Sequence, residues 1–193
     1  MRSYLQRNLE RKIQELNRRD FDGDLKVSFY DISEGKSASV NGSSTGWAAS
    51  IIKLPVMITV ADKIANGELD LETKLLVDHS MVLEETDIVS KLPINSALSV
   101  KALLYAMIVR SDNEATNILG KHVGVEEINR QMQSIGMSRS MLGHLLYRGA
   151  PRSSNDFNPD GSNITCTDDM VKHDEAVIFI AFADWIKCSC RIF

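Results

Sequence analysis

A nearly all-apolar helical segment that begins near residue 50 is the strongest constraint on the fold. Its apolar side chains recur at helical spacing, at Ile52, Val56, Ile58, Val60 and Ile64. Because the start of the segment is apolar on almost every side, the pattern predicts a helix buried among other elements. Pro55 falls close to the first turn, where a missing N–H does least harm, and Gly67 predicts the C-terminal end.

The segments around this helix show either the helical spacing of apolar residues, about 3.6 residues, or the strand alternation of 2 residues. Helices are predicted over residues 2–19, 125–135 and 164–171, and two more on either side of a break at 111–113, the first of them starting at Ser99. Strands are predicted over residues 26–32, 37–41 and 176–182. The first two strands form a hairpin, and residues 143–163 read as loop. This order predicts an α+β domain with a large helical region, whose antiparallel sheet takes strands from both ends of the chain.

Length and composition exclude several classes of protein. The chain has 193 residues, 44% of them hydrophobic and 25% charged, which is expected of one soluble domain over 1–193. The net charge of −4 argues against a nucleic-acid partner. No apolar run could span a bilayer, and residues 1–19 do not resemble a signal peptide, so the sequence as written predicts a cytoplasmic protein. Removal of an export signal would reverse that expectation.

The cysteines and histidines give no sign of a metal or a cofactor. Cys166, Cys188 and Cys190 are odd in number and do not form a disulfide framework, and no histidine lies at ligand spacing from the last two. His79, His122, His144 and His173 are scattered. We therefore expect no metal site and no cofactor.

Ser50 and Lys53 carry the first chemical signal. An i, i+3 spacing on a helix places both side chains on one face. A serine hydroxyl is a weak nucleophile that needs a base, and lysine serves when burial lowers its pKa. The N-terminal end of a helix also favours developing negative charge. The same spacing occurs at Ser33 and Lys36, but that pair lies in the predicted hairpin turn, so only Ser50 has a suitable context.

The tripeptide Ser111-Asp112-Asn113 is the second signal, at the predicted break between two helices. Ser, Asp and Asn are all common in loops and helix caps, so one interpretation is that the tripeptide only ends one helix and caps the next. The other is functional: Ser111 would relay a proton beside the lysine, Asn113 would bind a substrate carbonyl, and Asp112 would brace the loop.

Together, the two motifs resemble the serine–x–x–lysine and Ser-Asp-Asn signatures of class A β-lactamases and penicillin-binding proteins. They are separated by 61 residues (111 minus 50), and the flanking segments 48–55, 108–119, 135–137 and 163–167 are also similar to the family. The resemblance covers residues 1–171 and implies a β-lactamase/transpeptidase-like fold. It implies acylation of Ser50 by a β-lactam or related peptide amide, with Lys53 as base and the Ser50 N–H as half of the oxyanion hole.

Two departures from the family pattern lower the activity expected of the chain. Residues 128–174 contain no glutamate, although the family's Ω-loop uses one to activate the deacylating water; Asp156 and Asp160 are the available stand-ins. No Lys-Thr-Gly motif occurs, and this motif normally binds the substrate carboxylate. We therefore expect a truncated or internally deleted homologue, incomplete on its C-terminal side, with a sheet strand within 172–186 and an atypical tail at 187–193.

Two alternatives stay open at this point. One is a catalytically inactive relative of the same fold, which the missing glutamate and Lys-Thr-Gly favour. The other is a bundle-like interaction module, suggested by the amphipathic first helix and the methionine-rich segments. The sequence leaves the oligomeric state undetermined.

Overall fold

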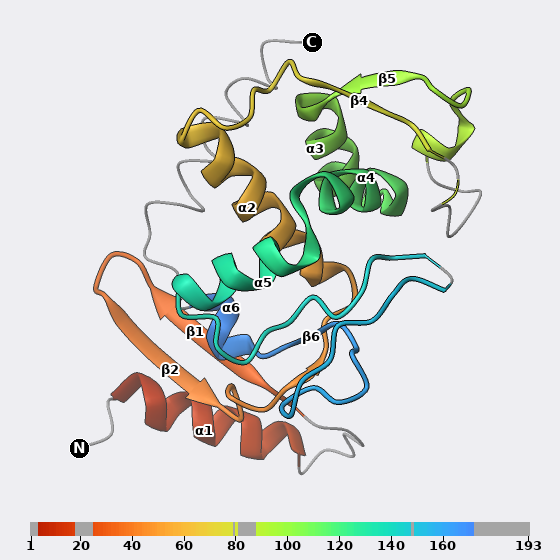
Figure 1. Ribbon diagram of the computed structural model, residues 1–193. Coiled ribbons are helices and arrows are strands. Elements are labelled where there is room, and N and C mark those ends of the chain that lie inside the picture. Colours follow the sequence, from red (N-terminus) through yellow and green to blue (C-terminus); the bar gives the residue numbers. More distant parts are fainter. Residues whose placement is uncertain (1–3, 18–24, 79, 81–87, 148, 172–193) are drawn as a thin grey trace. The chain divides into compact units, whose positions relative to one another are not determined.

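The computed structural model describes residues 4–17, 25–78, 80, 88–147 and 149–171 (Figure 1). The chain divides into two compact units. Unit 1 is built from residues 1–46, 135–140 and 165–193, and unit 2 from residues 47–134 and 141–164. The single domain expected over residues 1–193 stays a prediction. None of the helices within the described ranges is long and apolar enough to cross a membrane.

Unit 1 is a hairpin with a helix on either side of it in sequence. The helix α1 (Tyr4–Asn17) precedes β1 (Val27–Asp31) and β2 (Lys36–Val40), which pair antiparallel, and α6 (Thr167–Val171) follows much later in the chain. The predicted hairpin is therefore confirmed. Gln6 of α1 makes two hydrogen bonds with the backbone of β2. Its side-chain amide donates to the Ser39 carbonyl over 2.7 Å and accepts from the Ser39 N–H over 2.9 Å.

A polar cluster joins the hairpin to α6. Asp168 Oδ1 accepts hydrogen bonds from the hydroxyls of Ser28 and Ser39, each over 2.6 Å, and the Asp168 N–H donates to the Gly42 carbonyl over 2.9 Å. Thr167 Oγ1 lies 2.8 Å from Ser28 Oγ. A Cβ at Gly42 would collide with Asp168 Oδ1 and both serine hydroxyls, so the cluster requires glycine at this position.

Unit 2 is helical and contains the buried helix that the sequence predicts. A 3₁₀ turn (Ala49–Ile52) leads into α2 (Lys53–Ala65), which contacts all three of the helices α3 (Val100–Val109), α4 (Asn113–Val123) and α5 (Val125–Ser134). Val56 and Val60 of α2 are fully buried, as is Leu103 of α3. Burial of such side chains contributes about 1.5–3 kcal/mol each, which makes α2 the centre of this unit's core.

Two short ladder strands and a second 3₁₀ turn complete the named elements of unit 2. They are β4 (Lys74–Leu76), its antiparallel partner β5 (Ala97–Ser99), and η3 (Val89–Lys91). The strands β3 (Gly46–Trp47) and β6 (Ile164–Thr165) each begin in one unit and end in the other. No helix lies within the described part of the loop at 143–147 and 149–163, as the sequence predicts.

The helix ends follow the expected capping chemistry. Ser99 caps α3 by accepting from the Ala102 N–H over 3.2 Å, and Gly67 follows the end of α2 with a φ of +73°. One boundary was wrong: the last helix begins at Thr167 instead of residue 164, because Ile164 and Thr165 form β6. The strand at 176–182, the tail, Cys188, Cys190, His79 and His173 lie outside the described residues.

Candidate active site

Ser50 lies in the 3₁₀ turn that leads into α2, and its side chain is exposed. The preceding residue, Ala49, has a φ of +44°, a conformation that residues other than glycine rarely adopt. Such a backbone persists only where the surrounding structure enforces it, and it is enriched at functional sites. The sharp turn places Ser50 at the surface, three residues before the largely buried helix α2 begins at Lys53.

Lys53, the first residue of α2, is 3% exposed and makes three hydrogen bonds within the site. Its Nζ donates to the Ser111 carbonyl over 2.5 Å, to Ser111 Oγ over 2.9 Å and to Asn113 Oδ1 over 2.9 Å. A lysine ammonium has three donors and no acceptor. These three acceptors therefore suit the protonated form of Lys53.

Ser111 lies between the lysine and the first serine. Its Oγ donates to Ser50 Oγ over 3.3 Å, so the two hydroxyls and Lys53 Nζ form a continuous chain. Ser111 has a φ of +55°, which turns the chain sharply between α3 and α4. The structure thus brings Ser50, Lys53, Ser111 and Asn113 together.

Asp112, between Ser111 and Asn113 in the sequence, stabilises the turn that carries these two residues. It is 1% exposed and caps α4 by accepting from the Ala115 N–H over 2.8 Å. Its other oxygen accepts from the N–H groups of Ile88 and Val89 over 2.8 and 3.0 Å. These three N–H groups satisfy the hydrogen-bonding capacity of a buried carboxylate. The same bonds connect the start of α4 to the backbone at Ile88 and Val89.

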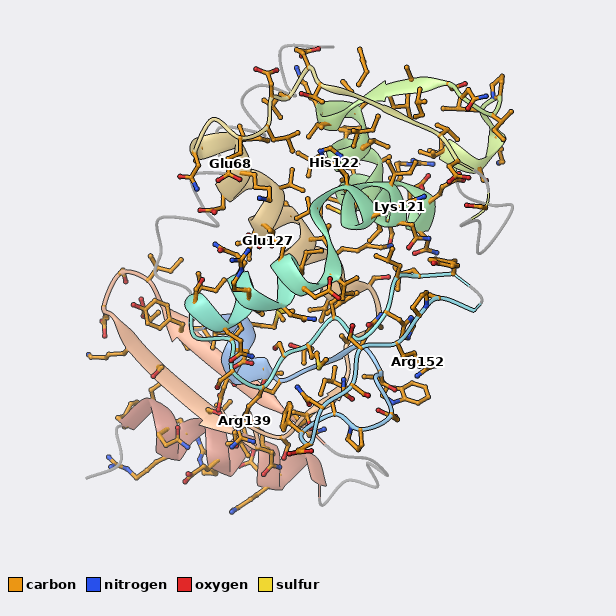
Figure 2. All side chains as sticks on the ribbon, viewed as in Figure 1. Glu68, Lys121, His122, Glu127, Arg139 and Arg152 are labelled. Atoms are coloured by element: carbon orange, nitrogen blue, oxygen red, sulfur yellow. The ribbon has the colours of Figure 1, made fainter. Side chains whose placement is uncertain are left out.

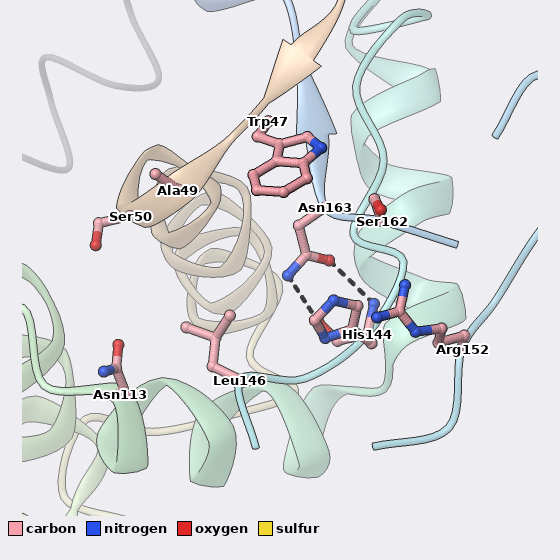
Figure 3. Close-up of a pocket in the computed structure, with 9 residues that line it drawn as sticks. All are labelled: Trp47, Ala49, Ser50, Asn113, His144, Leu146, Arg152, Ser162 and Asn163. Atoms are coloured by element: carbon pink, nitrogen blue, oxygen red, sulfur yellow. Dashed lines mark hydrogen bonds between the residues drawn. The ribbon is translucent and has the colours of Figure 1, made fainter. Parts of the chain in front are cut away.

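A pocket of about 410 Å³ opens beside Ser50 (Figure 3). Its lining residues come from the segment before α2, the start of α4 and the loop at 143–163: Trp47, Ala49, Ser50, Asn113, His144, Leu146, Arg152, Ser162 and Asn163. Figure 3 shows Ser50 and Asn113 at one end and Arg152 with His144 at the other. The sequence predicts only Ser50 and Asn113 of this set as site residues.

Two asparagines position the loop that forms the pocket wall. Asn117 of α4 donates to the Leu146 carbonyl over 3.0 Å and accepts from the Leu146 N–H over 2.6 Å. Asn163 accepts from the N–H groups of Gly143 and His144 over 2.8 and 3.0 Å, and its Nδ2 donates to the His144 carbonyl over 3.0 Å (Figure 3). The only sequence signal for the first asparagine is its place one helical turn after Asn113.

The two aspartates considered as stand-ins for the missing glutamate do not line the pocket in the described part of the chain. Asp160 accepts from the Ser162 hydroxyl over 2.8 Å and from the Ser162 N–H over 3.2 Å. These hydrogen bonds, led by that from the hydroxyl, hold the pKa of Asp160 below its usual value. Leu146, with an apolar side chain, is one of the residues of the same loop that line the pocket.

In the part of the chain that the structure describes, the remaining ionisable and sulfur-containing residues give no sign of a metal site or of a second nucleophile. Within the described residues, no three His, Cys, Asp or Glu side chains are grouped so that they could hold a metal ion. Burial raises the pKa of the Cys166 thiol, which disfavours the nucleophilic thiolate. His122 lies in the last turn of α4 (Figure 2), and His144 Nδ1 is 2.7 Å from the Leu145 carbonyl.

Comparison with known families identifies the chain. A model of the β-lactamase enzyme family matches residues 8–181. The chain belongs to this family. The β-lactamase-like resemblance and the α+β fold class are thereby confirmed. A search among curated proteins found no match.

Solved structures agree with this assignment. A PBP-A mutant in an acyl-enzyme complex with penicillin G is 25% identical with a TM-score of 0.71, and the match covers 86% of this chain and 59% of that one. A β-lactamase from Sphaerobacter thermophilus is 28% identical with a TM-score of 0.62, covering 72% and 51%. An ancestral class A β-lactamase at 20% identity supports the fold alone, with a TM-score of 0.72 and coverage of 92% and 70%.

The chain therefore spans about three fifths of the length of the PBP-A structure that it matches. The described residues include the helices α2 to α5 of unit 2 (Figure 1).

Proposed function

We propose that this chain is a serine hydrolase of the β-lactamase type, acylated at Ser50 by a β-lactam or a related peptide amide. The observation that carries the proposal is the chain of hydrogen bonds from Lys53 Nζ through Ser111 Oγ to Ser50 Oγ, at 2.9 and 3.3 Å. Such a chain provides a route by which a serine hydroxyl loses its proton while it attacks. A distance of 3.3 Å is long for a catalytic hydrogen bond, but these bonds often tighten only when substrate is bound.

In the proposed reaction, Ser50 Oγ forms a bond to the amide carbonyl carbon. For acylation Lys53 first loses one proton to solvent, and the two hydroxyl hydrogen bonds reverse relative to the structure, so that Ser50 Oγ donates to Ser111 Oγ and Ser111 Oγ donates to the neutral amine. The Ser50 proton then passes through Ser111 Oγ to Lys53, and the resulting ammonium is stabilised by the carbonyl of Ser111 and the side-chain oxygen of Asn113. The proton returns from Lys53 through Ser111 Oγ to the amide nitrogen as the C–N bond breaks, and Ser50 Oγ keeps the acyl group. The Ser50 N–H supplies one donor to the developing oxyanion.

The same residues support an inactive relative as a second candidate. Residues 128–174 contain no glutamate, no Lys-Thr-Gly motif occurs, and Leu146 lies in the pocket wall. In the family, the strand that carries Lys-Thr-Gly also donates one oxyanion-hole N–H, and removal of one such donor lowers turnover by about 10²–10³-fold. We therefore expect acylation to be detectable and hydrolysis of the acyl group to be slow.

Labelling with a fluorescent penicillin tests the proposal. We expect the wild type and Ser33→Ala to be labelled and Ser50→Ala not to be. Ser33 is a matched control, because it also precedes a lysine by three residues but lies exposed in the turn of the hairpin. Equal labelling of wild type and Ser50→Ala would end the proposal. A stable fold, shown by circular dichroism, with no labelling and no nitrocefin turnover would support the inactive relative.

A further inference from the structure

Arg152 is the feature of the pocket that the proposed chemistry does not use. It is exposed, lies on the loop at 143–163, and contributes to the pocket wall at the end opposite Ser50 (Figures 2 and 3). Arg152 brings a permanent positive charge to the described lining, whose other members are aromatic, aliphatic, hydroxyl, amide or imidazole side chains. A pocket with one fixed cation at its end favours a ligand with an anionic group at the corresponding position.

The hydrogen bonds around Arg152 leave it suited to this task. Its Nη1 donates to the Asp160 carbonyl over 2.9 Å, which fixes the side chain to its own loop. A guanidinium has five N–H donors in a planar fork that matches a carboxylate, so one bond to a carbonyl leaves capacity for a ligand.

The Asp160 carboxylate interacts electrostatically with Arg152, but it makes its hydrogen bonds with Ser162 and not with the guanidinium. Both carboxylate oxygens of Asp160 accept hydrogen bonds from Ser162, Oδ1 from its N–H and Oδ2 from its hydroxyl. Asp160 binds Arg152 through its backbone carbonyl.

We infer that Arg152 selects substrates that have a carboxylate remote from the carbonyl attacked by Ser50. The inference rests on the proposed function, since it assigns the substrate class of the same pocket. It also gives the chain a carboxylate-binding cation in the absence of a Lys-Thr-Gly motif. The pocket wall between the two ends includes Leu146 and Trp47. Trp47 is 87% exposed, so its indole is accessible to a ligand. An apolar spacer between the reacting amide and the carboxylate fits this wall.

Equilibrium binding to the Ser50→Ala protein tests the inference without any acylation. The ligands are benzylpenicillin, its methyl ester, and carbenicillin, which has an additional carboxylate on the acyl side chain. Calorimetry would be run on Ser50→Ala alone and with Arg152→Gln or Arg130→Gln added. Arg130 is the matched control, because it is an exposed arginine paired with Glu127 on α5 and does not line the pocket.

We expect Ser50→Ala to prefer the more anionic ligand of at least one pair by roughly fivefold to tenfold, as for a charge-assisted hydrogen bond that is partly exposed. Arg152→Gln should abolish that preference and Arg130→Gln should keep it. Preference for acid over ester would place the ring carboxylate at Arg152, and preference for carbenicillin would place the acyl-side carboxylate there. Three results would overturn the inference: a preference that survives Arg152→Gln, binding of all ligands without a preference, or no binding at all.

The outcomes separate this inference from the proposed function. An Arg152-dependent preference in a protein whose wild type is never acylated would keep the binding site and remove the reaction. Acylation of Ser50 with a preference that is indifferent to Arg152 would keep the reaction and remove the assignment of Arg152.

Discussion

Lys53 donates two hydrogen bonds to Ser111, one to its side-chain Oγ over 2.9 Å and one to its carbonyl over 2.5 Å. The carbonyl bond fixes the backbone of the turn between α3 and α4. The Oγ bond aligns the hydroxyl that reaches Ser50. A single buried cation thus sets both the position of the turn and the direction of its hydroxyl.

Removal of the Ser111 hydroxyl should slow acylation without unfolding the protein. Positioned proton transfer contributes about 10²–10⁴-fold to a rate, so we expect Ser111→Ala to lower the acylation rate constant by about 10²-fold. Stopped-flow labelling with a fluorescent penicillin measures it. Ser111→Gly is the control for backbone strain, because it also lacks the hydroxyl but tolerates the φ of +55°. Recovery of the rate in Ser111→Gly would show that strain, and not the hydroxyl, explains the loss.

Asp112→Ala should be far more destabilising than loss of an ordinary helix cap. The carboxylate caps α4 and also satisfies the N–H groups of Ile88 and Val89, so we expect a loss of about 3 kcal/mol in the free energy of unfolding. Ser99→Ala removes a more exposed cap of α3 and should cost about 1 kcal/mol. Urea denaturation followed by circular dichroism compares the two. Similar losses in both variants would contradict a bracing role for Asp112.

Leu146→Glu should accelerate release of the acyl group. Leu146 lines the pocket, and Asn117 fixes its backbone through both the N–H and the carbonyl. A carboxylate at this position could activate a water, an effect of about 10²–10⁴-fold for positioned general bases. The half-life of the labelled protein, followed by intact mass spectrometry, measures the change. Leu146→Gln is the matched control, and an equal gain in that variant would exclude base catalysis.

Gly42→Ala tests the polar cluster of unit 1. A Cβ there would overlap Asp168 Oδ1 and the hydroxyls of Ser28 and Ser39, so we expect a loss of about 1–3 kcal/mol in stability. Gly67→Ala is the comparison: it has a φ of +73° but open space around the added carbon, and we expect it to cost about 1–2 kcal/mol from backbone strain alone. Thermal melts of both variants give the order. A smaller effect at Gly42 than at Gly67 would mean that the cluster yields easily.

Local patterns of the sequence account for most of the elements but not for the pocket. Hydrophobic period and capping residues predict α1, the hairpin, the buried α2 and the N-cap at Ser99, because these depend on neighbours within a few positions. The short strands β3, β4, β5 and β6 are missed, since two or three residues give no periodic signal. The proximity of Ser50 to Ser111 follows from family resemblance, as no local rule relates positions 61 residues apart.

The wall of the pocket illustrates what a single sequence leaves out. Leu146 and Arg152 lie in a loop rich in turn-forming residues, where side-chain directions depend on long-range bonds to Asn117 and, for the neighbouring His144, to Asn163. The positive φ of Ala49 is equally hidden, because alanine normally avoids that conformation. Backbone geometry of this kind is set by the surrounding packing.

The most direct test of the account is the site of covalent attachment. After incubation with benzylpenicillin, proteolysis and mass spectrometry should find one penicilloyl group on the peptide that contains Ser50, and none on Ser50→Ala. An unmodified Ser50 peptide from folded wild-type protein, or an adduct on another residue, would contradict the assignment of Ser50 as the nucleophile.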